Sequence, residues 1–342
     1  MIWSGMALLI DEYSTVAELA AAWLADVRTS YRQQSTIESY ESTVRSVIVP
    51  HIGAFRLRDL NAGICDRLLK KVTAGKSPGY ARSVKRVLSV MLRFGVQHEA
   101  VRTNFILHVD QIRSNPTTHL DLEFDQVVGM LNLLRTWRGA NPGRRGGGVP
   151  DVELLEDLIL VMLGTSVRPG EALALRRQDV IITGERWKIR VEGTVSTTRK
   201  HGTIRKDQPK RERQKRTINT PIFTESVLRR RLADYVENPE GLLFPTRVGT
   251  VRQTHNLNRL LRDFREEYRS DLTAMGIDVD RLTSRLFRKA AATTVFKNVD
   301  GEAARLLLGH ARLETTMIYV KEDDEVPAIT AEALEARYPF TF

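Results

Sequence analysis

The chain has 342 residues and a formal net charge of +10, because 52 Lys and Arg outweigh 42 Asp and Glu. Its length predicts two domains, and its charge favours a polyanionic partner such as nucleic acid over an acidic small molecule. The single cysteine, Cys65, excludes an internal disulfide, and no Cys and His cluster has metal-ligand spacing. No apolar run approaches the roughly 20 residues that span a bilayer, and residues 1–10 do not resemble a signal peptide. We therefore expect a cytoplasmic protein with no membrane contact, no metal and no cofactor.

The first expected domain, residues 14–114, is all-α. Its apolar residues recur at helical spacing in four stretches, whose expected starts are Val16, Ser35, Asn61 and Ser77. In the second stretch Glu38 is placed to close a capping box on Ser35, and Pro50 is expected to end the helix. These four helices together predict a small helical domain.

The second expected domain, residues 120–342, begins after a linker whose clearest helix breaker is at Asn115 and Pro116. Helix is expected to resume near Glu123 and to give way to a glycine-rich loop at 138–150. That loop lacks the Gly-Lys-Ser/Thr ending of a phosphate-binding loop. Further helices are expected at 151–163, 224–236, 255–269 and 330–336.

A small β-sheet is expected in this second domain. Apolar and charged residues alternate from Trp187 to Val195, which predicts a half-buried strand, and 216–219 is its expected antiparallel partner. The segment between them is dense in Lys and Arg and predicts a long basic hairpin tip. The expected fold class is therefore mostly α with a small antiparallel β-sheet (α+β).

Six side chains are candidates for chemistry on a phosphate. Arg168 stands just before a helix that begins with Pro169, while Arg285 and Arg288 lie one helical turn apart. One lysine from the basic hairpin tip, and then His310 and Tyr319, complete the set. Cleavage of a phosphodiester by a tyrosine needs an ionised phenol, cations on the nonbridging oxygens and a proton for the leaving oxygen. Arginines suit the nonbridging oxygens because they stay charged and donate in pairs.

The order and spacing of these residues resemble the tyrosine recombinase or phage integrase family. The segment TSVRPGEALALRRQDV is similar to the first arginine box of that family, RLFRKAAATT to its His-x-x-Arg box, and LLLGHARLETTMIYV to its Leu-Gly-His box with the tyrosine that follows. The resemblance implies a core-type DNA-binding domain at 14–114 and a catalytic domain at 120–342. It implies that Arg168 and Arg288 grip the scissile phosphate, that His310 contacts it, and that Tyr319 is the nucleophile.

The lysine and one arginine are less closely tied to the family pattern. The sequence DQPK, which precedes Arg216, is similar to a Pro-Lys-Thr pattern in many integrases and implies that Lys210 is the general acid for the 5′ oxygen, with Lys206 in reserve. Arg285 stands where the family pattern has histidine, and Ser166 replaces a usual glycine. Arginine donates to a phosphate but does not accept a proton, so the base for Tyr319 would be His310, water or a mobile group.

The resemblance implies site-specific DNA recombination, namely integration or excision of a phage or other mobile element through a 3′-phosphotyrosyl intermediate. Its expected partner is double-stranded DNA, bound by a homotetramer whose free form is a monomer or weak oligomer. The tail from about residue 320 is acidic and predicts exchange of this segment between protomers. Two alternatives remain, a DNA-binding regulator of the same fold that has lost catalysis and a type IB topoisomerase that relaxes DNA without joining partners.

Overall fold

The computed structural model describes residues 10–113, 122–140, 151–182, 186–207 and 215–317. The chain divides into two compact units, one formed by residues 1–118 with 197–202 and the other by residues 119–196 with 203–342. The domain limits expected at 114 and 120, including Asn115, lie at or beyond the edges of the described segments. Among the described helices, none is long and apolar enough to cross a membrane.

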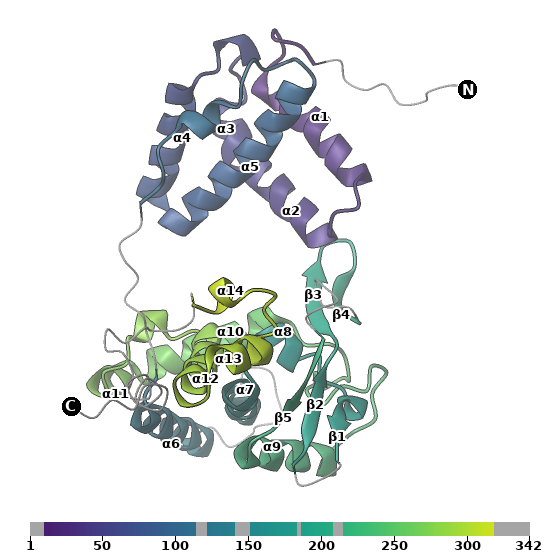
Figure 1. Cartoon of the computed structure of the whole chain (residues 1–342), viewed down its shortest axis with the longest axis vertical. Coiled ribbons are helices and arrows are strands. Elements are labelled where there is room, and N and C mark those ends of the chain that lie inside the picture. The colour runs from purple at the N-terminus through teal and green to yellow at the C-terminus, as the bar shows by residue number, and fades with distance from the viewer. Residues whose placement is uncertain (1–9, 114–121, 141–150, 183–185, 208–214, 318–342) are drawn as a thin grey trace, which may run out of the picture. The chain divides into compact units, whose positions relative to one another are not determined.

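Residues 10–113 of the first unit fold into helices joined by turns (Figure 1). Its elements are α1 (Val16–Thr29), α2 (Gln34–Thr43), the π-helical η1 (Val44–Ile48), α3 (Val49–Ile52), η2 (Leu57–Asp59), α4 (Ala62–Gly75), α5 (Pro78–Gln97) and η3 (Phe105–His108). They share one apolar core, in which the rings of Trp23 and Tyr40 lie 5.2 Å apart. Side chains cap the first turns of three helices. The hydroxyl of Thr15 caps α1, the amide oxygen of Asn61 caps α4, and the hydroxyl of Ser77 caps α5.

The second helix differs from its prediction at both ends. It begins at Gln34, so Ser35 lies inside the first turn, and no side chain caps the helix at Gln33. Helical structure also continues through Pro50 to Ile52, because a π-turn precedes the proline. Proline has no N–H to donate and its ring clashes with the carbonyl four residues earlier in a regular α-helix. The wider π-turn accommodates the ring, so Pro50 does not end the helix.

The second unit packs helices around a central helix, α7 (Figure 1). Its elements are α6 (Phe124–Ala140), α7 (Val152–Thr165), α8 (Pro169–Ala172), η4 (Arg177–Asp179), β1 (Val180–Ile181), β2 (Lys188–Val191), β3 (Thr194–Thr198), β4 (Gly202–Lys206), β5 (Arg216–Asn219), α9 (Ile222–Ala233), α10 (Thr254–Glu267), α11 (Arg269–Ala274), η6 (Val279–Arg281), α12 (Ser284–Asn298), α13 (Gly301–Leu308) and α14 (Leu313–Met317). Helix α7 is apolar on nearly every face and contacts α6, α8, α9, α10 and α12. The expected fold class, mostly α with a small antiparallel sheet, is confirmed.

The described strands form two sheets, whereas the sequence predicted one. Strands β1, β2 and β5 form one antiparallel sheet, in which Ile189 pairs with Ile218 as expected. Strand β2 ends at Val191, however, and β3 pairs with β4 in a separate two-stranded sheet. Gly193 lies at the break between β2 and β3. A β-carbon at this position would lie 2.5 Å from the buried guanidinium of Arg205, so a larger side chain would clash with it. The expected basic tip therefore contains a strand pair of its own.

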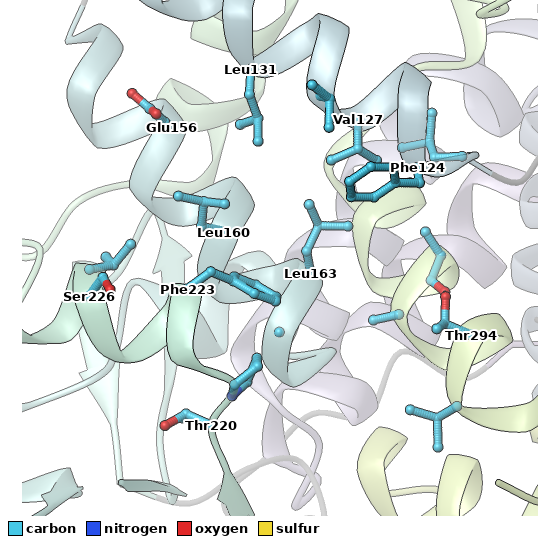
Figure 2. Close-up of a pocket in the computed structure, with 18 of the residues that line it drawn as sticks. Phe124, Val127, Leu131, Glu156, Leu160, Leu163, Thr220, Phe223, Ser226 and Thr294 are labelled. Carbon is cyan, nitrogen blue, oxygen red and sulfur yellow. The ribbon is translucent and has the colours of Figure 1, made fainter. Parts of the chain in front are cut away.

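An apolar pocket of about 1080 Å³ lies between α6, α7, α9 and α12 (Figure 2). Phe124, Leu160 and Phe223 supply much of its wall, and Phe124 remains 78% exposed. Arg135, Arg186 and Arg230 also line this pocket, and two of them are ion-paired: Arg135 with Glu156 over 3.1 Å, and Arg230 with Asp157 and Glu153. The pocket is thus an open apolar surface.

Candidate active site

Arg168 is placed by the short helix α8. It is the residue before the helix, and its own N–H donates to Glu171 Oε2 over 2.9 Å, while its Nη1 donates to Glu171 Oε1 over 2.7 Å. Pro169 suits the first helical position because its fixed φ matches the helix and it has no N–H to leave unpaired. The Arg168 side chain keeps 37% of its surface exposed, so it is held at its base and open to a ligand.

Glu171 is the centre of the site. Its side chain is 3% exposed and accepts from Arg168 and, at 2.9 Å, from Nη2 of Arg216, while Nη1 of Arg288 lies 4.0 Å away. Burial tends to raise the pKa of the Glu171 carboxyl, but Arg216 and Arg168 outweigh it and lower that pKa overall. Three guanidinium groups around one carboxylate leave a net positive charge, which suits a phosphate.

Arg288 is fully buried on α12, with a side chain that is 2% exposed. Its Nη1 donates to the carbonyl of Ser166, and its Nη2 donates to the carbonyl of Leu308 over 2.7 Å. The Ser166 hydroxyl donates back to the Arg288 carbonyl over 3.0 Å. The C-terminal ends of α7 and α13 are therefore both hydrogen-bonded to the same arginine.

Ser166 explains one departure from the family pattern. It caps α7 in the left-handed region, with φ 52° and ψ 25°, where glycine avoids a cost of about 1–2 kcal/mol. The hydrogen bond from its hydroxyl to the Arg288 carbonyl offsets part of that cost. Serine therefore keeps the turn that the family pattern assigns to glycine and adds a contact that glycine lacks.

His310 follows the turn that ends α13, where Gly309 has φ 64°. Its Nε2 lies 3.4 Å from Arg288 Nη2 and its Nδ1 lies 3.1 Å from Thr316 Oγ1 on α14. Burial, together with the positive charges of Arg288 and Arg168, lowers the pKa of His310 from 6.5 to about 4. The imidazole is therefore neutral near pH 7 and acts through its hydrogen bonds.

Comparison with known proteins identifies the family of this chain. Residues 144–325, more than half of the chain, match the phage integrase family. The chain belongs to that family.

Two curated relatives cover almost the whole chain. The tyrosine recombinase XerC of Methylobacterium nodulans is 25% identical over 344 residues, covering 94% of this chain and 92% of that relative. The tyrosine recombinase XerC of Methylobacterium sp. strain 4-46 is 26% identical over 349 residues, covering 97% of this chain and 96% of that relative.

Solved integrase structures share the fold. The Tn1549 transposon integrase, in complex with a circular intermediate DNA, matches with a TM-score of 0.76 at 17% identity, over 95% of this chain and 99% of that one. A lambda integrase tetramer bound to a Holliday junction matches with a TM-score of 0.66 at 14% identity, over 93% and 82%. At such low identity these likenesses establish the architecture of this integrase and no individual residue.

The structure brings three of the six candidate residues together. Arg168, Arg288 and His310 share the cluster around Glu171, whereas Arg285 is exposed and makes no hydrogen bond or ion pair within the described part of the chain. Lys210 and Tyr319 lie outside the described residues. The reserve lysine, Lys206, is the last residue of β4.

Two members of the cluster were not among the candidates. Glu171 lies in the first turn of the helix that begins at Pro169, and Arg216 is the first residue of the expected strand at 216–219. Sequence spacing gives no signal for their contact, because 45 residues separate them and only the tertiary fold joins them.

The neutral state of His310 predicts how stability depends on pH. An unfolded histidine titrates near 6.5 and the folded one near 4, so between these values the unfolded chain binds more protons. We expect the free energy of unfolding to be largest above pH 6.5 and to fall as the pH drops toward 4. Urea unfolding at pH 7, 6 and 5 should show this fall, and His310→Gln should make it shallower. An equal slope in that variant would contradict a buried neutral His310.

Proposed function

We propose that this integrase is a site-specific DNA recombinase that cleaves and rejoins DNA without metal or cofactor, through a 3′-phosphotyrosyl bond. The observation that carries the proposal is the cluster of Arg168, Arg288 and His310 around the buried Glu171. Such a cluster supplies fixed positive charge where a pentacoordinate phosphate develops negative charge, and it needs no reorganisation during the reaction. Double-stranded DNA is the partner that fits a chain of charge +10.

Each candidate residue has a proposed role. Arg168 and Arg288 hold the nonbridging oxygens of the scissile phosphate, and neutral His310 hydrogen-bonds to the same group. The hydroxyl of Tyr319 gives its proton to His310, water or a mobile group and its oxygen attacks phosphorus, while the 5′ oxygen leaves and takes a proton from Lys210. Arg285, exposed one turn before Arg288, contacts a phosphate through charge alone. A 5′ hydroxyl from another duplex then displaces the tyrosine, so the bond energy is conserved.

The proposed assembly is a tetramer on DNA, because exchange of both strands between two duplexes uses four active sites. The acidic tail, with its run from Glu322 to Glu325, is proposed to dock on the neighbouring protomer. The apolar pocket lined by Phe124 and Phe223 is the candidate receptor, because it is an open apolar surface (Figure 2). The lambda integrase tetramer on a Holliday junction is a precedent in a neighbour of the same fold.

One experiment with nicked suicide duplexes tests the function. The duplexes carry DNA that flanks the gene, and a detergent-stable protein–DNA adduct is expected with the intact chain and not with Tyr319→Phe. Joining of two site-bearing duplexes is expected as well, whereas a chain ending at residue 321, which keeps Tyr319 but lacks the acidic run, should cleave but not complete joining. Absence of any adduct at every salt concentration would favour the regulator, and relaxation of plasmids without joining would favour the topoisomerase.

A further inference from the structure

Arg216 is a buried arginine that links two ends of the active site. It is the first residue of β5, and its side chain is 8% exposed. Its Nη2 donates to Glu171 Oε2 over 2.9 Å, and its Nε donates to the carbonyl of Leu307 over 2.9 Å. One guanidinium therefore connects the carboxylate that holds Arg168 to the last turn of α13.

The contact at α13 lies beside the residues that position His310. Arg216 and Arg288 bind the successive carbonyls of Leu307 and Leu308, which are unpaired within the helix because they belong to its last turn. Two cations at a helix C-terminus are also favoured by the helix dipole. A β-carbon on Gly309 would lie 3.1 Å from Nη1 of Arg216, so the arginine packs directly against the turn that leads to His310.

We propose that Arg216 is a positioning residue, which holds Glu171 and the Gly309 turn so that Arg168, Arg288 and His310 face one phosphate. This inference rests on the proposed function. The Nε and Nη2 groups of Arg216 are hydrogen-bonded to Leu307 and Glu171, and in this proposal Arg216 acts on the phosphate through these neighbours. Its charge also contributes to the low pKa of His310, after burial and the larger effects of Arg288 and Arg168.

Lysine should not replace Arg216. An ammonium is a single compact group, whereas the guanidinium spans two acceptors on different elements with donors in a fixed fork. Arg216→Lys would keep one contact and lose the other, and a misplacement of about 1 Å in such a site costs about 100-fold in rate. Folding should survive, because Glu171 keeps its hydrogen bonds from Arg168.

A matched control exists on the same unit. Arg252 also donates through Nη2 to a carboxylate, that of Asp151 over 2.9 Å, and through Nε to a carbonyl, that of Pro245 over 2.7 Å. It makes no contact with Glu171 among the described residues. We expect Arg216→Lys to lower the rate of adduct formation by about 10- to 100-fold with DNA affinity changed less than about threefold. Arg252→Lys should remain close to the unaltered chain in both measurements.

A titration that does not depend on activity completes the test. In the folded, DNA-free protein, NMR should show the pKa of His310 near 4 in the unaltered chain and in Arg252→Lys. In Arg216→Lys and in Arg216→Gln it should rise toward 6.5, because the released turn hydrates the imidazole. The inference would be overturned if the Arg216 variants kept the His310 pKa of the unaltered chain and cleaved DNA within threefold of its rate. It would also be overturned if Arg252→Lys lost as much cleavage activity as Arg216→Lys. If the unaltered chain forms no adduct, the proposed function fails while the titration still decides the role of Arg216.

Discussion

Arg288→Lys is expected to slow formation of the covalent DNA adduct by about 100- to 1000-fold, the usual cost of one lost donor to a transition-state charge. Lysine keeps the positive charge but not the geometry, since Arg288 holds the carbonyls of Ser166 and Leu308 with two different nitrogens. Equilibrium binding of DNA should change less than tenfold, because many exposed cations contribute to it. Single-turnover cleavage of a suicide duplex, together with a binding isotherm at matched salt, separates the two effects.

Arg285→Lys is the matched control, on the same helix and one turn away. Arg285 is exposed, and the proposed contact with a phosphate depends on charge that lysine retains. Its cleavage rate should stay within about fivefold of the unaltered chain. If both variants lost activity equally, the distinction between a buried gripping arginine and an exposed charge contact would be wrong.

Glu171→Gln is expected to lower the free energy of unfolding by about 3–5 kcal/mol, the typical cost of removing one partner from a buried ion pair. Glutamine has the same shape but no charge, and its amide nitrogen would face guanidinium donors. Arg216 and Arg288, both nearly fully buried, would then lack a carboxylate. Urea unfolding at pH 7 measures this loss, and cleavage should fall with it because Arg168 is no longer held.

The control for Glu171 is Glu153→Gln. Glu153 is 36% exposed and pairs with Arg138 at 3.2 Å and Arg230 at 3.4 Å. Solvent-exposed pairs contribute little, so this variant should cost less than about 1 kcal/mol. A Glu171→Gln protein as stable and as active as the unaltered chain would show that the carboxylate does not organise the arginines.

The sequence predicted much of this site because its residues lie in short segments with their own local structure. Arg168 before Pro169, and the Leu-Gly-His turn with Gly309 at φ 64°, are positions where local backbone rules identify a helix start or end. Family membership, inferred from the same segments, is confirmed. The roles of Arg168, Arg285, Arg288, His310, Lys210 and Tyr319 stay predictions.

Other features depend on tertiary contacts that no local pattern carries. The contact of Arg216 with Glu171 forms only when β5 reaches α8. The hydrogen bonds between Ser166 and Arg288 join residues that are 122 positions apart in the sequence. From the sequence, Ser166 therefore showed only that the usual glycine was replaced. Pro50 was expected to end a helix, and only the preceding π-turn shows why it does not.

The central claim is that Tyr319 forms the covalent bond to DNA. The adduct trapped on a suicide duplex can be digested with nuclease and protease, and the peptide that carries the nucleotide can be sequenced by mass spectrometry. We expect one modified peptide from the intact chain, with the 3′ phosphate on Tyr319, and no modified peptide from Tyr319→Phe. A nucleotide on any other residue, or an adduct that persists in Tyr319→Phe, would contradict it.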